Sequence, residues 1–202
     1  MFNRSKNVLY KRNIIFVLGS ILMGLGVSIA TLGEKGTDSF STLAIGISNH
    51  TPFTIGQASF VLTLFLVFVT LFIDRSQISI GTILNPLILG FSTDLSLFLF
   101  EKIGVSNSLL VSLSGTLIIG VGIGVYTATD FGKGAYEAIT FSLTKKFRFK
   151  LRYIRLMGDI LFITSGFLLG ANIGLATLIS TLFIGIVIEK MNNLTTNKFI
   201  YN

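Results

Sequence analysis

Long runs of apolar residues, separated by short polar segments, make up most of this chain. A helix needs about 20 apolar residues to cross the hydrocarbon core of a bilayer. Six runs reach or approach that length: 14–32, 55–73, 78–100, 109–128, 153–171 and 173–188. The pattern predicts an all-α membrane protein with six transmembrane helices.

Two weaker apolar segments, 38–49 and 135–147, are too short to span a bilayer. About 12 helical residues extend roughly 18 Å at 1.5 Å per residue. Irregular backbone at membrane depth is tolerated where protein or a water-filled cavity satisfies its polar groups. We therefore expect two re-entrant half-helices. An alternative count treats both segments as spans and gives eight.

Composition agrees with a membrane location. Hydrophobic residues make up 51% of the chain and charged residues 12%, against about 25% charged in ordinary soluble domains. The sequence has no cysteine, and His50 is its one histidine. Thiolate and multi-histidine metal sites are thereby excluded, and no cofactor is expected. No hydrolase or protease motif is present, so the sequence does not indicate an enzyme.

The net charge of +7 comes from basic clusters at the ends of the apolar runs. Such clusters mark cytoplasmic loops, and they contact anionic lipid headgroups rather than nucleic acid. With six spans, Arg75 and three groups all fall on the cytoplasmic side: 4–12, 145–155 and 190–198. Eight spans would move Arg75 outside. Both termini are predicted to be cytoplasmic, in a bacterial cell membrane.

The two halves of the chain resemble each other. A shift of 96 places Gly24 on Gly120, and a shift of 95 places Gly90 on Gly185. Three spans per half would make the halves inverted, an architecture common among secondary transporters. The predicted organisation is a basic tail, two membrane repeats and a C-terminal tail: 1–13, 14–104, 105–191 and 192–202.

Short polar motifs point to a known family. They are GTDSF, TIG and GTILN in the first half, and GKGAYE and LRYIR in the second: 36–40, 54–56, 81–85, 132–137 and 151–155. Across roughly 14–190 the chain resembles the YczE/YyaS/YitT-type family of bacterial integral membrane proteins, for which transport is suspected. Ser39 and Ala135 stand where the family usually has Pro, and Tyr136 where it usually has Arg.

The polar residues of the half-helices and of the third span form the candidate substrate site. Half-helix N-termini bring positive dipole ends to the membrane midplane. The candidates are Asp38, Ser39, Thr42, Thr82, Asn85, Gly134, Ala135 and Glu137. A bound anionic group is expected against Gly134 and Ala135. The alternative roles are structural: a helix cap for Asp38, and hydrogen bonding between helices for Asn85.

Arg155 and Asp159 are spaced i, i+4 in the fifth span, and we expect them to form a charge pair. Ionisable residues within a membrane are functional candidates, so the pair is either structural or part of a transport path. The function predicted is a secondary-type permease or exporter of a small solute, with its site between the repeats. The alternative is an accessory or regulatory membrane protein that acts through helix contacts. Membrane lipid is the expected partner. The further candidate partners are a small-molecule substrate and a second copy of the chain.

Overall fold

The structure is a computed structural model that describes residues 2–105 and 107–197, with side chains from residue 10 onward. These residues form eight α-helices and one 3-10 turn, and they include no strand. The elements are α1 (Phe2–Leu32), α2 (Ser39–His50), α3 (Ile55–Ile73), η1 (Arg75–Gln77), α4 (Ile80–Ile103), α5 (Leu109–Thr127), α6 (Ala135–Phe147), α7 (Leu151–Leu168) and α8 (Leu175–Thr195). The all-α prediction is confirmed.

The helices lie close to the predicted segments, and the differences concern their ends. Helix α1 begins at Phe2, so the segment predicted as an N-terminal tail continues the first helix. Helix α8 continues to Thr195, beyond the predicted end of the apolar run at 188. Lys198, counted in the third basic group, lies outside the described residues.

Five helical stretches are long and apolar enough to cross a membrane: Tyr10–Leu32, Ile55–Ile73, Ile80–Ile103, Leu109–Thr127 and Leu175–Thr195. Helix α7, the predicted fifth span, has 18 residues, three of them charged: Arg152, Arg155 and Asp159. It is about 27 Å long. The sixth span therefore stays a prediction.

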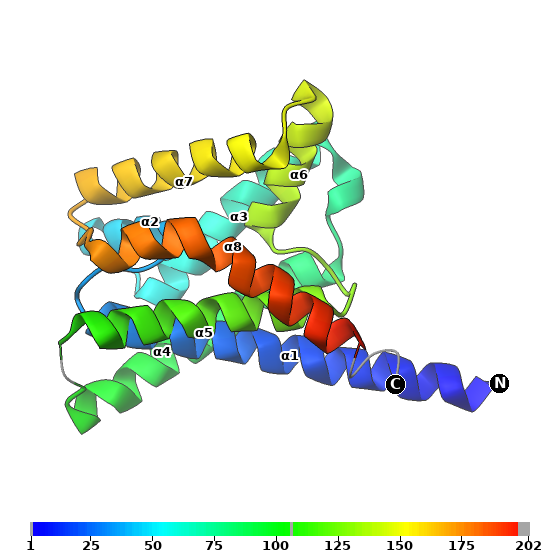
Figure 1. The fold of residues 1–202 in the computed structure, drawn as a ribbon, viewed down its shortest axis with the longest axis horizontal. Helices are drawn as coiled ribbons and strands as arrows, with labels where there is room; N and C mark the ends of the chain where they lie inside the picture. Colours follow the sequence, from blue (N-terminus) through cyan, green and yellow to red (C-terminus); the bar gives the residue numbers. More distant parts are fainter. Residues whose placement is uncertain (1, 106, 198–202) are drawn as a thin grey trace.

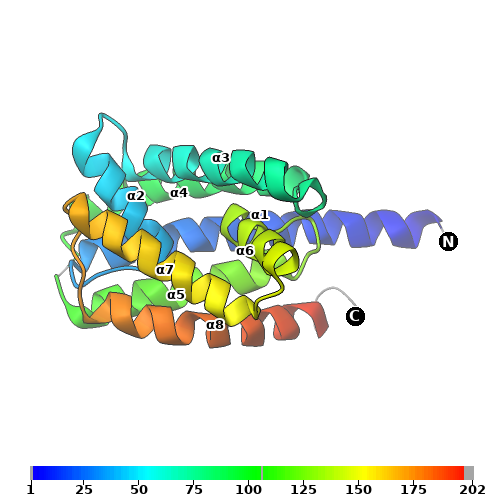
Figure 2. The ribbon, with the colours of Figure 1, turned by 90° about the horizontal axis from the view of Figure 1, so that it is seen from above.

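The long helices lie side by side along the long axis of the molecule (Figure 1, Figure 2). Helix α1 packs against α4 and α5, and α5 packs against α8. The half-helices pack on the other side, with α2 against α7 and α3, and α6 against α3. The two half-helices are therefore held between long helices rather than laid on the surface.

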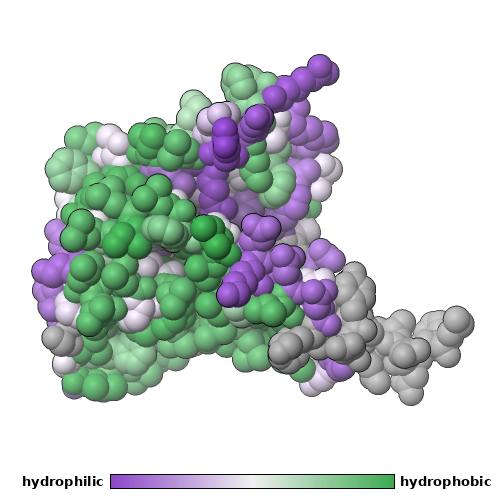
Figure 3. Space-filling model, in the orientation of Figure 1, coloured by the Kyte–Doolittle hydropathy of each residue, from purple (hydrophilic) through white to green (hydrophobic). Residues whose placement is uncertain are grey.

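Polar and apolar side chains are distributed in the opposite way to a soluble protein. Many serines and threonines are fully buried, including Ser20, Thr70 and Thr93 at 0% exposure, whereas Phe72 and Phe91 are 75% and 73% exposed. In a soluble protein large apolar side chains are mostly buried. Apolar side chains cover much of the visible face, and hydrophilic ones gather towards its ends (Figure 3). The surface therefore suits a bilayer.

Small residues allow close helix contacts within each predicted half. A Cβ at Gly24 of α1 would collide with Ser92 of α4, and a Cβ at Gly120 of α5 would lie 3.0 Å from Val187 of α8. Gly24 and Gly120 correspond at the shift of 96, and Ser92 and Val187 at the shift of 95. Glycines that correspond at this shift thus each permit a close helix contact, as packing through small residues allows. The repeat itself stays a prediction.

Candidate functional site

Both half-helices begin at one internal cavity. Asp38 is the N-cap of α2 and Gly134 the N-cap of α6, and both residues line the cavity. Its other lining residues include Ser39, Asn85, Ala135, Glu137, Arg155 and Asp159. The cavity leaves about 40 Å³ for the centres of water molecules, which is room for a few waters. The fold therefore brings most of the predicted site residues together.

Asp159 joins the starts of the two half-helices. Its Oδ1 accepts hydrogen bonds from the Ser39 hydroxyl of α2 at 2.5 Å and from the Tyr136 hydroxyl of α6 at 2.8 Å. Among the described residues, the ion pair that forms is Lys145–Asp74 rather than Arg155–Asp159. The expected i, i+4 pair is therefore corrected. A buried carboxylate needs hydrogen-bond donors, and hydroxyls on neighbouring helices supply them here.

Glu137 occupies the position expected for a bound anion. A Cβ at Gly134 would collide with both the Glu137 carboxylate and the Tyr126 hydroxyl. Tyr126 donates to Glu137 Oε2 at 3.4 Å. In the first turn of α6 this carboxylate lies close to the positive end of the helix dipole. The chain's own carboxylate therefore lies beside Gly134, where the sequence led us to expect an external anion.

The remaining candidates divide between the cavity and the backbone. Asn85 lines the cavity, and its amide donates to the Ser20 hydroxyl of α1 at 2.9 Å. Thr42 and Thr82 are not among the lining residues. Their hydroxyls donate at 2.8 Å to the backbone carbonyls of Asp38 and Lys133 respectively. The Thr42 bond lies within the first turn of α2, whereas the Thr82 bond joins α4 to the segment before α6.

Asp38 has the capping role that the sequence offered as an alternative. Its Oδ2 accepts from the backbone N–H of Ser41 at 3.3 Å, as is typical of an aspartate N-cap. Its Oδ1 is buried and has no hydrogen-bond partner in the described part of the chain. One oxygen of this carboxylate is therefore used by the helix and the other is left over.

Two wider grooves adjoin the cavity on one side. One, of about 610 Å³, is lined by residues of η1, α5, α6, α7 and α8. The other, of about 440 Å³, lies between α7 and α8. Arg155 lines the cavity and both grooves, and Glu189 of α8 lines both grooves. The cavity therefore has an approach from the end where α6 finishes and α7 begins, which is the predicted cytoplasmic end.

Helices α3 and α4 pack closely, in contrast to α7 and α8. Asp94 of α4 accepts from the Thr54 hydroxyl at 2.6 Å and from the Gly56 backbone N–H at 2.9 Å. Thr54 is the N-cap of α3. Asp94 thus binds the first turn of α3 from the neighbouring helix. Within the described residues, α7 and α8 make no comparable packing contact.

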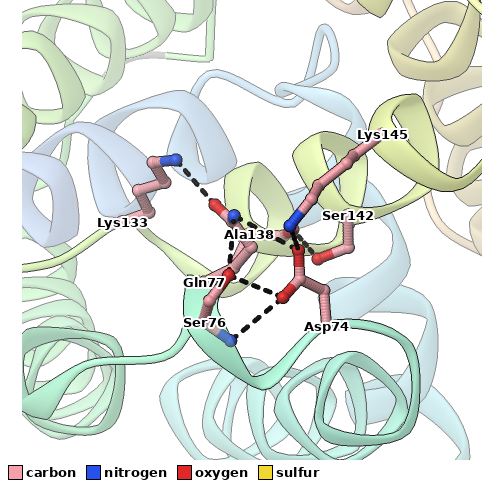
Figure 4. A network of polar contacts seen from close by, with 7 residues as sticks. All are labelled: Asp74, Ser76, Gln77, Lys133, Ala138, Ser142 and Lys145. Carbon is pink, nitrogen blue, oxygen red and sulfur yellow. Dashed lines mark hydrogen bonds and ion pairs between the residues drawn. The ribbon is translucent and has the colours of Figure 1, made fainter. Parts of the chain in front are cut away.

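A polar network links the α3–α4 connection to α6 at the basic end of the molecule (Figure 4). Lys145 of α6 pairs with Asp74 at 2.9 Å, and Lys133 donates to Gln77 at 2.7 Å. The pKa of Asp74 lies below the ordinary value of 3.8. The main cause is the hydrogen bond from the Ser76 hydroxyl to its carboxylate, and the second is the one from Lys145. The connection that carries Arg75 is thus fixed to the same end as the basic cluster.

Two tyrosines belong to the site although the sequence analysis did not predict them as site residues. Tyr126 and Tyr136 line the cavity and donate to its carboxylates. Tyr136 was marked only as a departure from the family pattern. A tyrosine at the first turn of a half-helix is a signal that could have found it, because a buried phenol hydroxyl usually needs an acceptor.

Comparisons with known proteins agree with the membrane character of the chain. Residues 10–193 match the model of a family of unknown function, DUF6198. The chain is 24% identical to the uncharacterized membrane protein YczE of Bacillus subtilis over 186 residues, which cover 91% of this chain and 86% of the relative. It is 22% identical to the uncharacterized protein YyaS of the same organism, covering 91% and 93%. An uncharacterized protein of Haemophilus influenzae is 27% identical, covering 92% and 85%.

No solved structure matches the chain. The matched family model covers most of the described residues, from early in α1 to the last turns of α8. The predicted resemblance to YczE and YyaS is confirmed. The chain is thus a multi-pass membrane protein that belongs to the DUF6198 family.

Proposed function

We propose that the chain is a secondary-type permease or exporter that binds a small solute between its two halves. The observation that carries this proposal is the meeting of two half-helix N-termini on one carboxylate, Asp159, inside a cavity. Converging half-helices at a central site are typical of secondary transporters. An accessory protein, the alternative function, needs no polar cavity; here Asp38, Asn85 and Glu137 all face the same one.

The difference between the two ends supports alternating access. The α7–α8 groove leads towards the cavity from the predicted cytoplasmic end, while Asp94 joins α4 to α3 towards the other end. In an inverted repeat, the equivalent motion in the other half closes one side and opens the other. The structure then corresponds to a state open to the cytoplasm, and substrate crosses as α7 and α8 close while α3 and α4 separate.

The orientation can be tested with single cysteines, because the native chain has none. Cysteines at Ser76 and Asn193 are expected to react with membrane-impermeant maleimide from the cytoplasm, and a cysteine at Asn107 from outside. The ion pair between Lys145 and Asp74 places Ser76 near the basic cluster, which favours six spans over eight. External labelling at Ser76 would contradict the six-span topology.

Transport itself is tested with purified protein in proteoliposomes, after a thermal-shift screen of small solutes. A cysteine at Thr181, which lines both the cavity and the α7–α8 groove, should react with a charged thiol reagent from the cytoplasmic side, and a transported solute should protect it. A cysteine at Phe91, 73% exposed on the apolar surface, is the matched control and should stay unlabelled. If Thr181 also stays unlabelled and no solute gives flux, the accessory function is favoured.

A further inference from the structure

The cavity at the centre of the molecule is acidic. Three carboxylates line it, those of Asp38, Glu137 and Asp159, against one basic side chain, Arg155. Because charges are costly to keep at membrane depth, each usually has a partner or a function. The cavity wall therefore has more acidic than basic side chains.

Two of the three carboxylates are engaged with hydroxyl donors of the protein. Asp159 Oδ1 accepts from Ser39 and Tyr136, and Glu137 Oε2 accepts from Tyr126. Glu137 lies in the first turn of α6 and Asp38 caps α2, so the positive ends of both half-helices already face protein carboxylates. These helix ends therefore leave no need for an anionic ligand.

Asp38 is different because half of its carboxylate is unused. The residue lines the cavity and is 7% exposed, and its buried Oδ1 has no hydrogen-bond partner among the described residues. A buried carboxylate oxygen without a donor is strongly unfavourable. A proton or a cation in the cavity removes that cost.

Other side-chain oxygens line the same cavity as Asp38. The Asn85 side chain donates through its nitrogen to Ser20, which leaves its amide oxygen free to coordinate. Carboxylate, hydroxyl and amide oxygens are the ligands that hard cations prefer. Among the residues described, no group of three acidic or histidine side chains is placed to hold a metal ion, so a multi-carboxylate divalent site is not favoured.

We propose that this cavity is a binding site for a small monovalent cation, Na⁺ or a proton, held by Asp38 at the start of α2. The space for water centres, about 40 Å³, fits an ion with a few waters and no larger solute. The solute then occupies the two adjoining grooves, of about 610 and 440 Å³, which both share Arg155 with the cavity. As a coupling site this rests on the proposed transport function, whereas cation binding is measurable without transport.

Thermal unfolding of the purified full chain in detergent tests the sodium case. Replacing choline chloride by NaCl at constant ionic strength is expected to raise the Tm of wild type by a few degrees, because a ligand that binds the folded state stabilises it. Asp38→Asn should lose this shift. Glu101→Gln, an exposed change on α4 away from the cavity, is the matched control and should keep it.

The same variants test the proton case. If Asp38 holds a proton in the folded state, wild type gains stability as the pH falls from 8 to 5, whereas Asp38→Asn lacks that gain. Glu137, Asp159, Arg155, Tyr126 and Tyr136 also face the cavity. Glu137→Gln and Asp159→Asn are therefore run in parallel, and each should keep more of the pH dependence than Asp38→Asn.

The outcomes separate this inference from the proposed function. A chain that shows no sodium shift, and whose pH dependence is the same with and without Asp38, overturns the cation site even if it transports. Cation binding without flux keeps the site and contradicts the permease. If Asp38→Asn does not fold, isothermal titration of wild type with NaCl at pH 6 and pH 8 replaces it: heat at both pH values indicates sodium, heat only at pH 8 indicates competition with a proton, and heat at neither contradicts the sodium site.

Discussion

Helices α3 and α4 of the first half pack together, whereas the equivalent helices α7 and α8 of the second half lie apart. Gly90 of α4 faces Gly56 of α3, so that a Cβ at Gly90 would lie 2.8 Å from the Gly56 carbonyl oxygen. Gly185, its counterpart in α8, has nothing within 4 Å of that position. Segments that correspond at the shift of 95 thus pack in two different ways. The proposed alternating access requires two such packings.

Polar groups differ between the same two regions. Asp94 caps α3 through Thr54 and Gly56. At the shift of 95, Glu189 of α8 corresponds to Asp94, and it is exposed in the open grooves. Lys150, the N-cap residue of α7, makes no side-chain capping hydrogen bond. In the proposed transport cycle, closure of the α7–α8 groove brings Glu189 to the start of α7 as its cap.

The largest expected difference comes from filling the two glycine positions. Gly90→Leu inserts a side chain into a closed helix contact, and overpacking of this kind typically costs about 1–3 kcal/mol and occasionally more. Gly185→Leu enters open space, so its unfolding free energy should stay within about 0.5 kcal/mol of wild type. Thermal or denaturant unfolding in detergent measures both, and equal losses would remove the contrast between the halves.

The same Gly185→Leu variant also tests the motion. If α7 and α8 must close during transport, a leucine between them should abolish flux in proteoliposomes while the protein stays folded. Full flux by this variant would show that the groove does not close.

The second comparison concerns Asp159 of α7 and Thr63 of α3, which correspond at the shift of 96 and both line the cavity. Asp159→Val leaves the Ser39 and Tyr136 hydroxyls without their acceptor, at about 1–3 kcal/mol for a buried unpaired group. The Thr63 hydroxyl donates to the Ser59 carbonyl of its own helix, so Thr63→Val should cost well under about 1 kcal/mol. Unfolding measurements on the pair check this.

A double variant at Arg155 and Asp159 tests whether these two residues form a structural ion pair. If Asp159 depends on hydroxyl donors, adding Arg155→Leu to Asp159→Leu should not recover stability. Substantial recovery in the double variant would restore the charge pair.

The third comparison replaces the carboxylates of Asp94 and Glu189 by amides. Asp94→Asn weakens charge-assisted bonds to Thr54 and Gly56 and should cost about 1–2 kcal/mol. Glu189→Gln changes an exposed group, so its stability should be within about 0.5 kcal/mol of wild type. Its flux should nevertheless fall, because the closed second half loses its cap. An unaltered transport rate for Glu189→Gln contradicts the inferred role.

The smallest effect is expected at the polar network that joins η1 to α6. Because the pKa of Asp74 is lowered in the folded state, its contribution to stability is present at neutral pH and is lost as the pH falls below about 4. Asp74→Asn should show little change in Tm at pH 7 in high salt, where an exposed pair is screened. A large decrease in Tm under those conditions would show that this connection contributes more to stability than we expect.

The helices and the starts of both half-helices follow from sequence because they depend on local features. Apolar runs define the long helices, and the all-α membrane character needs nothing more. Asp38 before an apolar segment predicts an N-cap, which α2 shows. Segment length predicts that 38–49 and 135–147 are too short to span, and helices α2 and α6 have 12 and 13 residues.

The partners of the cavity residues were decided only by tertiary structure. Local spacing assigned Asp159 to Arg155, four residues away, yet it bonds to Ser39, which is 120 residues away. A buried carboxylate takes its donors from whichever helices pack beside it, and no spacing rule within one helix encodes that. The sequence by itself determined which segments are helical, because that depends on local apolar runs and caps. The packing of helices against each other decided which carboxylate oxygen stays unpaired and which groove is open.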